Sequence, residues 1–263
     1  MSHAFDAFAR EQAGNGFSAA TIRARISAIR SAARHAGVPP DELTRDHVVA
    51  WLAAGQYAPA TRACYLSHLT AWSEHLDRPE LVFRIRRTTP PPSHPDPLPE
   101  DELERLLEAV AVDQVLTAWV LLGAYAGLRA HETAQMASTD RRGDMVRVKG
   151  KGGRTDVLPI PPRLEASLQP FAGVDGPLWP GTRPRQVSER VGRVAARIGL
   201  RRFRYHRLRH RFGTAVYRAS HDLLLTQQLM RHQSPVTTQG YAAVAADSGR
   251  TTVRSLPGAG EIT

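Results

Sequence analysis

The stretches YHRLRHRFGT (residues 205–214) and LMRHQSPVTTQGY (residues 229–241) decide the predicted fold and chemistry of this chain. His206 and Arg209 lie three positions apart, which places both on one face of a helix. Arginine guanidinium groups match the geometry of phosphate oxygens and stay charged. A tyrosine such as Tyr241 can attack the held phosphorus while nearby cations stabilise the developing charge. The pattern indicates metal-free chemistry on a phosphodiester.

Two upstream segments add the remaining cations. GLRAHE (127–132) carries Arg129, and VKGKGGR (148–154) carries Lys149 and Lys151, which are the only lysines of the chain. Lysine can release its proton whereas arginine effectively cannot, so this placement favours a general acid on a β-turn. The alternative is chance in an arginine-biased sequence.

In this order and spacing, the four segments resemble the signature boxes of the tyrosine recombinases, also called the phage integrase family, over about residues 98–245. The resemblance implies a catalytic set without a metal or other cofactor. Its members are Arg129, Lys151, His206, Arg209, His232 and Tyr241.

The resemblance also implies a role for each member of this set. Arg129 and Arg209 would bind the scissile phosphate, and Lys151 would protonate the 5′-oxygen leaving group. His232 would contact a non-bridging oxygen, and His206 would hydrogen-bond the phosphate or assist proton transfer. The nucleophile would be Tyr241, identified by its register nine residues after His232.

Several neighbouring residues allow other interpretations. The choice of Lys151 over Lys149 follows the family register, and Lys149 and Arg154 are interpreted as phosphate contacts. The family usually has glycine before the His232 position, whereas this chain has Arg231, which is predicted to contact DNA or to distort the loop.

No metal site is predicted. His131 and Glu132 begin an HExxH-like pattern, but Gln135 stands where the second histidine is required. Glu132 is therefore expected to support the site or to form a local salt bridge. His210 has no cysteine or acidic partner nearby in sequence and is interpreted as packing.

The predicted fold class is mainly α with a small β-hairpin or sheet. Residues 98–263 form the expected catalytic domain with a C-terminal tail, in which 145–149 and 155–160 flank a glycine turn as strands. Residues 84–97 contain prolines and arginines and are predicted to be a linker. Residues 1–83 are predicted to be helical, similar to the family's SAM-like core-DNA-binding domain.

Helical patterns in the N-terminal part have clear start signals. Ser18 is predicted to cap a helix that runs to about residue 35, and Asp41 is predicted to cap the next one. A third helix is expected over 59–76. Four arginines on the polar faces are either solvated or DNA-binding; they are Arg23, Arg25, Arg30 and Arg62.

Composition agrees with a polyanionic partner. The net charge is +10 and the pI is near 10.7, which suits DNA, although many other proteins are basic. Cys64 is the sole cysteine and cannot form an intramolecular disulfide. The apolar run at 115–126 is too short for a membrane span and predicts a buried helix. With no signal peptide found, the expected location is the cytoplasm.

The expected function is site-specific DNA recombination, typical of minimal phage integrases that integrate or excise a mobile element. A host Xer-type dimer resolvase, a type IB topoisomerase-like enzyme and a non-catalytic DNA-binding protein are the alternatives. The resemblance implies double-stranded DNA sites as partners, a homotetramer on two sites and an accessory directionality factor. No membrane partner is expected.

Overall fold

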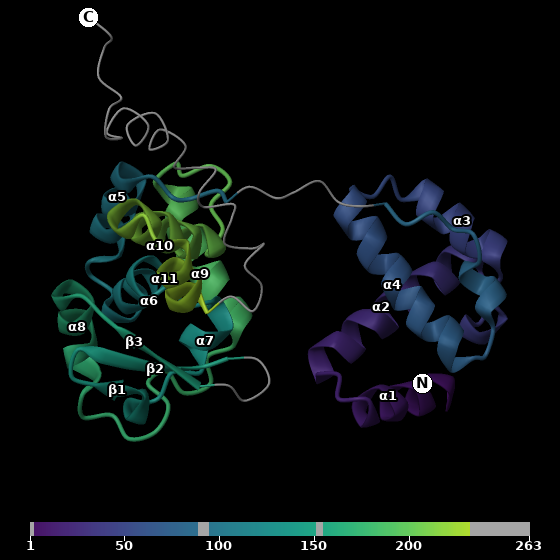
Figure 1. Ribbon diagram of the computed structural model, residues 1–263, viewed down its shortest axis with the longest axis horizontal. Coiled ribbons are helices and arrows are strands. Elements are labelled where there is room, and N and C mark those ends of the chain that lie inside the picture. The colour runs from purple at the N-terminus through teal and green to yellow at the C-terminus, as the bar shows by residue number, and fades with distance from the viewer. Residues whose placement is uncertain (1–2, 89–94, 151–154, 232–263) are drawn as a thin grey trace, which may run out of the picture. The chain divides into compact units, whose positions relative to one another are not determined.

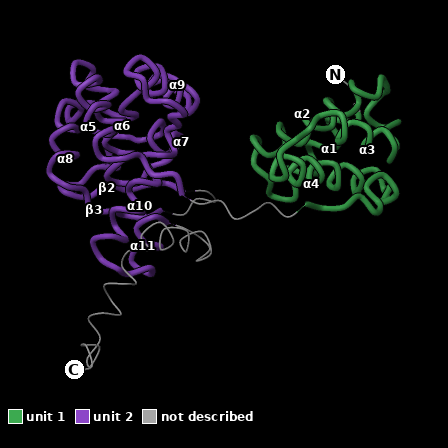
Figure 2. The backbone as a smooth tube through the Cα atoms, turned by 90° about the horizontal axis from the view of Figure 1, so that it is seen from above, with its two compact units in different colours: residues 1–93 green, residues 94–263 purple. Residues whose placement is uncertain are grey.

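The computed structural model describes residues 3–88, 95–150 and 155–231 (Figure 1). These residues are mainly α-helical with one small antiparallel sheet, which confirms the predicted fold class. The chain divides into two compact units, residues 1–93 and 94–263 (Figure 2). The boundary between the units falls inside the predicted linker.

The described residues of the first unit form four α-helices and two 3₁₀ turns. They are α1 (His3–Gly14), α2 (Ala19–Ala36), η1 (Pro40–Glu42), α3 (Arg45–Ala54), α4 (Pro59–His75) and η2 (Pro79–Val82). The first of these helices was not predicted from sequence, whereas the predicted helices over 18–35 and 59–76 correspond to α2 and α4.

The start of α3 corrects one sequence prediction. Asp41 does not cap this helix, because it lies inside η1. Thr44 is the cap instead, and its hydroxyl accepts a hydrogen bond from the His47 N–H at 3.3 Å. By contrast, Ser18 caps α2 as predicted, since its hydroxyl accepts from the Thr21 N–H at 3.2 Å.

An aromatic cluster organises the core of the first unit. Trp72 is fully buried and packs against Phe5 and Phe8, with ring centroids 5.5 and 5.2 Å away. Its indole N–H donates to the Pro40 carbonyl at 3.0 Å. Because α1 supplies both phenylalanines and α4 supplies the tryptophan, this cluster joins the ends of the unit's chain.

The second unit contains the remaining described helices and the sheet. Its α-helices are α5 (Glu100–Val110), α6 (Gln114–Tyr125), α7 (Ala130–Ala134), α8 (Pro162–Leu168), α9 (Pro184–Arg197), α10 (His206–Ser220) and α11 (Leu223–Met230). Two 3₁₀ turns, η3 (Ser138–Asp140) and η5 (Gln169–Phe171), and the strands β1 (Arg141–Arg142), β2 (Met145–Lys149) and β3 (Thr155–Pro159) complete it.

Helix α6 is the centre of this unit, as its apolar sequence predicts. It contacts α5, α7, α8, α9 and α10 (Figure 1). The Tyr205 hydroxyl, just before α10, donates to the Trp119 carbonyl at 2.6 Å and lies 2.9 Å from the Thr133 hydroxyl. These bonds fix the start of α10 against α6 and α7. None of the described helices is both long and apolar enough to cross a bilayer.

The sheet has the strand order β1-β2-β3, with both pairings antiparallel. Val146 lies opposite Leu158, and both side chains are buried against the helices. Lys149 and Thr155 form the last pair of the β2–β3 hairpin before its turn. The predicted hairpin strands are therefore present, while the turn residues 151–154 lie outside the described residues.

Candidate active site

The buried carboxylate of Glu132 lies among three arginines, Arg129, Arg209 and Arg231, which together form the arginine cluster of this site. Its side chain is 1% exposed, although it sits only three residues after the partly exposed Arg129. The Glu132 Oε2 accepts the backbone N–H of Arg129 at 2.7 Å, and Oε1 accepts the Arg129 Nη1 at 3.0 Å. One carboxylate thus holds both the backbone and the guanidinium of Arg129 at the start of α7.

Gly127 provides the close backbone approach that this cluster needs. Its φ is +61°, a conformation that side-chain-bearing residues rarely adopt. A Cβ added there would lie 2.5 Å from the Phe212 Cδ1 in α10. Glycine is required here on both counts, and it lets the segment before Arg129 pass directly over α10.

Arg209 is the most deeply buried arginine of the cluster, at 1% exposure. It lies in α10 and donates through Nη1 to the Gly127 carbonyl and through Nη2 to the Met230 carbonyl. Arg209 thereby ties α10 both to the Arg129 segment and to the end of α11.

Arg231 is the third arginine of the cluster, and it points inward. Its side chain is 4% exposed, and its Nη2 lies 2.8 Å from the Glu132 Oε2. From the sequence, Arg231 was predicted to contact DNA or to distort the loop. In this conformation the guanidinium is directed to a buried carboxylate instead, because the end of α11 packs close to the start of α7.

The electrostatics of Glu132 follow from these neighbours. Burial by itself would raise the pKa of Glu132, but the charges of Arg231, Arg209 and Arg129 and the Arg129 N–H bond outweigh it. The pKa of Glu132 is therefore lowered from its ordinary value. The carboxylate stays ionised and partly neutralises three arginines that would otherwise repel one another.

His206 begins α10, and its ring packs against the His210 ring at a centroid distance of 4.5 Å. Desolvation by surrounding protein atoms, followed by the charges of His210, Arg209 and Arg129, lowers the pKa of His206 to about 4. The free protein therefore presents a neutral imidazole near pH 7. A bound phosphate dianion or monoanion would raise this pKa, because opposite charge favours the protonated ring.

We expect stability to fall as the pH drops from about 6.5 towards 4, in part because of His206. In that window the unfolded chain binds a proton on this ring and the folded chain does not, so unfolding takes up protons and is favoured by acid. Urea unfolding at a series of pH values gives the free energy of unfolding as a function of pH. Between pH 6.5 and 4 this free energy should fall less steeply in His206→Gln than in the wild-type protein. His210→Gln and His68→Gln control for the two other histidines whose pKa burial lowers. An unchanged slope in His206→Gln would contradict the lowered pKa.

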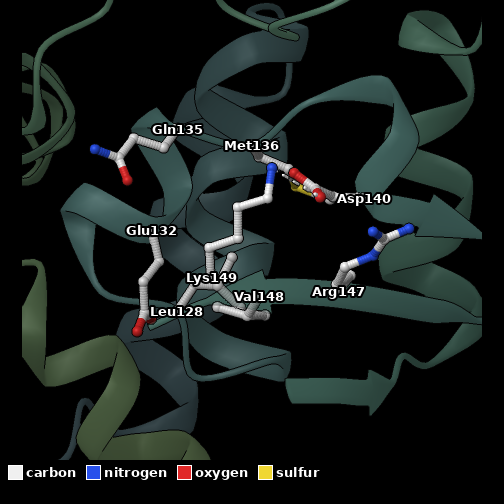
Figure 3. Close-up of a pocket in the computed structure, with 8 residues that line it drawn as sticks. All are labelled: Leu128, Glu132, Gln135, Met136, Asp140, Arg147, Val148 and Lys149. Atoms are coloured by element: carbon white, nitrogen blue, oxygen red, sulfur yellow. Dashed lines mark ion pairs between the residues drawn. The ribbon is translucent and has the colours of Figure 1, made fainter. Parts of the chain in front are cut away.

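Lys149 lies at the end of β2 and reaches towards a second buried carboxylate (Figure 3). Its Nζ is 3.5 Å from Asp140 Oδ1, and the Asp140 side chain is only 4% exposed. The same pocket is lined by Glu132, so it adjoins the arginine cluster. Lys149 is therefore anchored at the turn end of the hairpin.

Four of the predicted residues lie outside the described residues: Lys151, Arg154, His232 and Tyr241. Of the predicted catalytic set, the structure thus brings together Arg129 and Arg209 and places His206 at the start of the same helix as Arg209. Within the described ranges, no group of three or more histidine, cysteine or acidic side chains is arranged to hold a metal ion.

The predicted DNA-binding arginines of the first unit differ in their surroundings. Arg23 and Arg30 line an open depression along α2 together with Arg34. Arg25 instead lies over the Phe17 ring at 3.9 Å and donates to Gln12. Arg62 donates to a backbone carbonyl in α3 at 3.3 Å. Arg30 also lies over a ring, that of Phe5, at 4.9 Å, but Arg23 and Arg30 are exposed whereas Arg25 and Arg62 are half-buried. The first two are therefore more accessible to a phosphate than the other two.

Residues 97–248 match the model of the phage integrase family. Tyrosine recombinase XerC from Chromohalobacter salexigens is 31% identical over 207 residues, which cover 70% of each chain. The chain belongs to the phage integrase family of tyrosine recombinases. It is accordingly a tyrosine-type site-specific recombinase.

Solved structures of tyrosine recombinases extend the similarity. The integrase from mycobacterium phage Brujita is 31% identical, with 98% of this chain and 94% of that chain covered and a TM-score of 0.51. A lambda integrase dimer bound to a COC′ core site is 19% identical, with 90% and 75% covered and a TM-score of 0.71. At that identity the second match shows a shared tyrosine recombinase fold.

Asp140 is the residue of this recombinase site that sequence reasoning missed. Asp140 lies in η3 and Lys149 lies in β2, so their contact joins two different elements. No helical or strand periodicity in the sequence predicts such a contact. The inward orientation of the Arg231 side chain could not be predicted from the sequence either. The sequence shows only that an arginine replaces the glycine that the tyrosine recombinases usually have at this position.

Proposed function

We propose that this recombinase cleaves and rejoins specific DNA sites through a 3′-phosphotyrosyl link to Tyr241, and that it serves integration or excision of a phage or mobile element. The single observation that carries the proposal is the cluster in which Glu132 and the Gly127 carbonyl hold Arg129 and Arg209 together. Two arginines fixed side by side suit the two non-bridging oxygens of one phosphate.

The reaction follows from this clamp. The phenolic O–H of Tyr241 gives up its proton, for which the neutral His206 imidazole is the proposed acceptor. The phenolic oxygen forms a bond to phosphorus, and the bond from phosphorus to the 5′-oxygen breaks. Lys151 supplies a proton to that leaving oxygen, while Arg129, Arg209 and His232 stabilise charge on the non-bridging oxygens. The ester energy is kept in the phosphotyrosyl link, so a 5′-hydroxyl from another strand can reseal the chain without ATP. Neither a metal nor a nucleotide has a required role in these steps.

The integrase role is our proposal, and an Xer-type role is its alternative. The relatives include both kinds of recombinase: the phage Brujita integrase and the XerC relative are each 31% identical to this chain. Lambda integrase has been solved as a tetramer bound to a Holliday junction. We propose the same assembly here: four protomers on two DNA sites in the cytoplasm, with a directionality factor as an accessory partner.

The test is capture of DNA in EDTA. The protein is incubated with nicked duplexes from its genomic neighbourhood, in which the 5′-hydroxyl strand released by cleavage diffuses away. A covalent band on a denaturing gel is the expected result, and mass spectrometry of the digested band should find a nucleotide on Tyr241. Specific gel-shift binding without any covalent band would favour a non-catalytic DNA-binding protein.

Integrase and resolvase roles are separated by the substrates that recombine. An integrase should join two non-identical sites, one from the element and one from the host chromosome. An Xer-type resolvase should instead recombine two copies of a single chromosomal site. Relaxation of a supercoiled circle in the absence of any specific site would favour the topoisomerase-like alternative.

A further inference from the structure

Arg231 occupies a backbone position that favours glycine. It ends α11 with φ 54° and ψ 43°, in the left-handed region. A side chain is costly there because the Cβ approaches the following carbonyl oxygen. Strained residues of this kind persist where their surroundings hold them, and they concentrate at functional sites. An arginine in this place therefore needs an explanation from its contacts.

The guanidinium of Arg231 is enclosed by polar partners. Besides the 2.8 Å ion pair with Glu132, Nη1 donates to the Ala126 carbonyl at 3.3 Å and Nη2 approaches the Gly127 carbonyl at 3.4 Å. The Arg231 side chain is 4% exposed. These contacts are with Glu132 and with the segment that leads into Arg129.

Arg231 shares one partner with each of the two predicted phosphate-binding arginines. Glu132 Oε2 accepts from Arg231, while Oε1 of the same carboxylate accepts from Arg129. The Gly127 carbonyl faces both Arg231 and Arg209. One side chain at the end of α11 is thus joined to both arginines through a single carboxylate and a single carbonyl.

The net charge of this cluster favours binding of an anion on its exposed side. Three arginines lie around the Glu132 carboxylate, so these four side chains together carry an excess of positive charge. A bound phosphate would supply negative charge, and Arg129, at 36% side-chain exposure, is the arginine open to it. Arg231 occupies the inner side of Glu132, which leaves the Arg129 guanidinium on its outer side.

We propose that Arg231 is a positioning residue of this recombinase, which holds Arg129 and Arg209 in register for one phosphate through Glu132 and the Gly127 carbonyl. The proposal rests on the proposed function in that the phosphate is the scissile one. It assigns no contact between Arg231 and DNA.

The test uses Arg231→Gly in the full chain, because glycine keeps the left-handed backbone and removes only the side chain. At saturating nicked duplex, the rate of covalent capture should fall on the order of 10- to 100-fold, as expected for a small displacement of a reacting group. The dissociation constant for the same duplex should change by less than about threefold, because the removed side chain is buried and is proposed to make no phosphate contact. Arg231→Lys retains the charge but not the fork, and should recover part of the rate.

A DNA-free measurement accompanies the rates. The backbone N–H of Arg129 donates to Glu132, so its hydrogen exchange should accelerate in Arg231→Gly if Arg231 holds that carboxylate in place. Arg202→Gly is the matched control, because Arg202 is an exposed arginine with φ 59°. It should change neither the capture rate nor the exchange of Arg129.

The outcomes separate the roles. A weaker dissociation constant with an unchanged rate at saturation would mean that Arg231 contacts DNA, and would overturn the proposal. A lower melting temperature with unchanged capture and exchange would mean a purely structural role, and would overturn it equally. Should the wild-type protein capture no DNA, the proposed function fails, and faster Arg129 exchange in the variant would still support positioning. If the glycine variant does not fold, the same measurements on Arg231→Lys decide.

Discussion

Replacing Tyr241 with phenylalanine is expected to abolish covalent capture of DNA, slowing strand cleavage by at least about 10⁴-fold, because it removes the oxygen that is proposed to form the ester. The substitution removes one oxygen and leaves the ring, so specific DNA binding should persist within about threefold. Gel-shift titration and the denaturing-gel assay, run on the same nicked duplex, measure the two quantities separately. A loss of binding together with capture would point to misfolding instead.

Tyr217 supplies the matched control. It lies in α10, in the same unit, and its ring faces His221 at 6.3 Å. Tyr217→Phe removes the same atom from a residue that has no register with His232, so capture should stay within about threefold of wild type. Capture that survives in Tyr241→Phe and disappears in Tyr217→Phe would show that the nucleophile has been misassigned.

Replacing Arg209 with alanine is expected to damage both chemistry and stability. Loss of one of the two arginines proposed to bind the phosphate should slow capture on the order of 10³-fold, as for other charge-stabilising groups. The carbonyls of Gly127 and Met230 would lose their buried donor, which should lower the free energy of unfolding by about 2–4 kcal/mol. Single-turnover capture and urea unfolding measure the two effects.

Arg209→Lys and Arg218→Ala complete the comparison. Lysine keeps the charge but lacks the planar fork, so it should retain part of the stability and little of the rate. Arg218 lies exposed on the same helix, and its removal should change stability by less than about 0.5 kcal/mol. A normal capture rate in Arg209→Ala, measured on the folded fraction, would contradict the clamp.

Local physics explains which parts of the fold could be predicted. Ser18 and Gly37 delimit α2 because an N-cap hydroxyl and a left-handed glycine act within one helical turn. The apolar run of α6 predicts burial without any knowledge of its partners. The start of α3 was misplaced for a related reason: Asp41 and Thr44 are both good caps, and the 3₁₀ turn after Pro39 excludes the first.

The sequence by itself therefore determined the family, the mainly helical fold with its hairpin, and the residue types of the site. Long-range packing, in contrast, turns Arg231 inward, buries Glu132 between Arg129 and Arg231, and brings Asp140 to Lys149. The difference lies in the sequence separation over which each interaction acts. Caps and periodicity act over a few neighbouring residues, whereas Glu132 and Arg231 lie 99 positions apart. They meet because α10 and α11 pack together and Arg209 joins both to the Gly127 segment, and no local pattern encodes that contact.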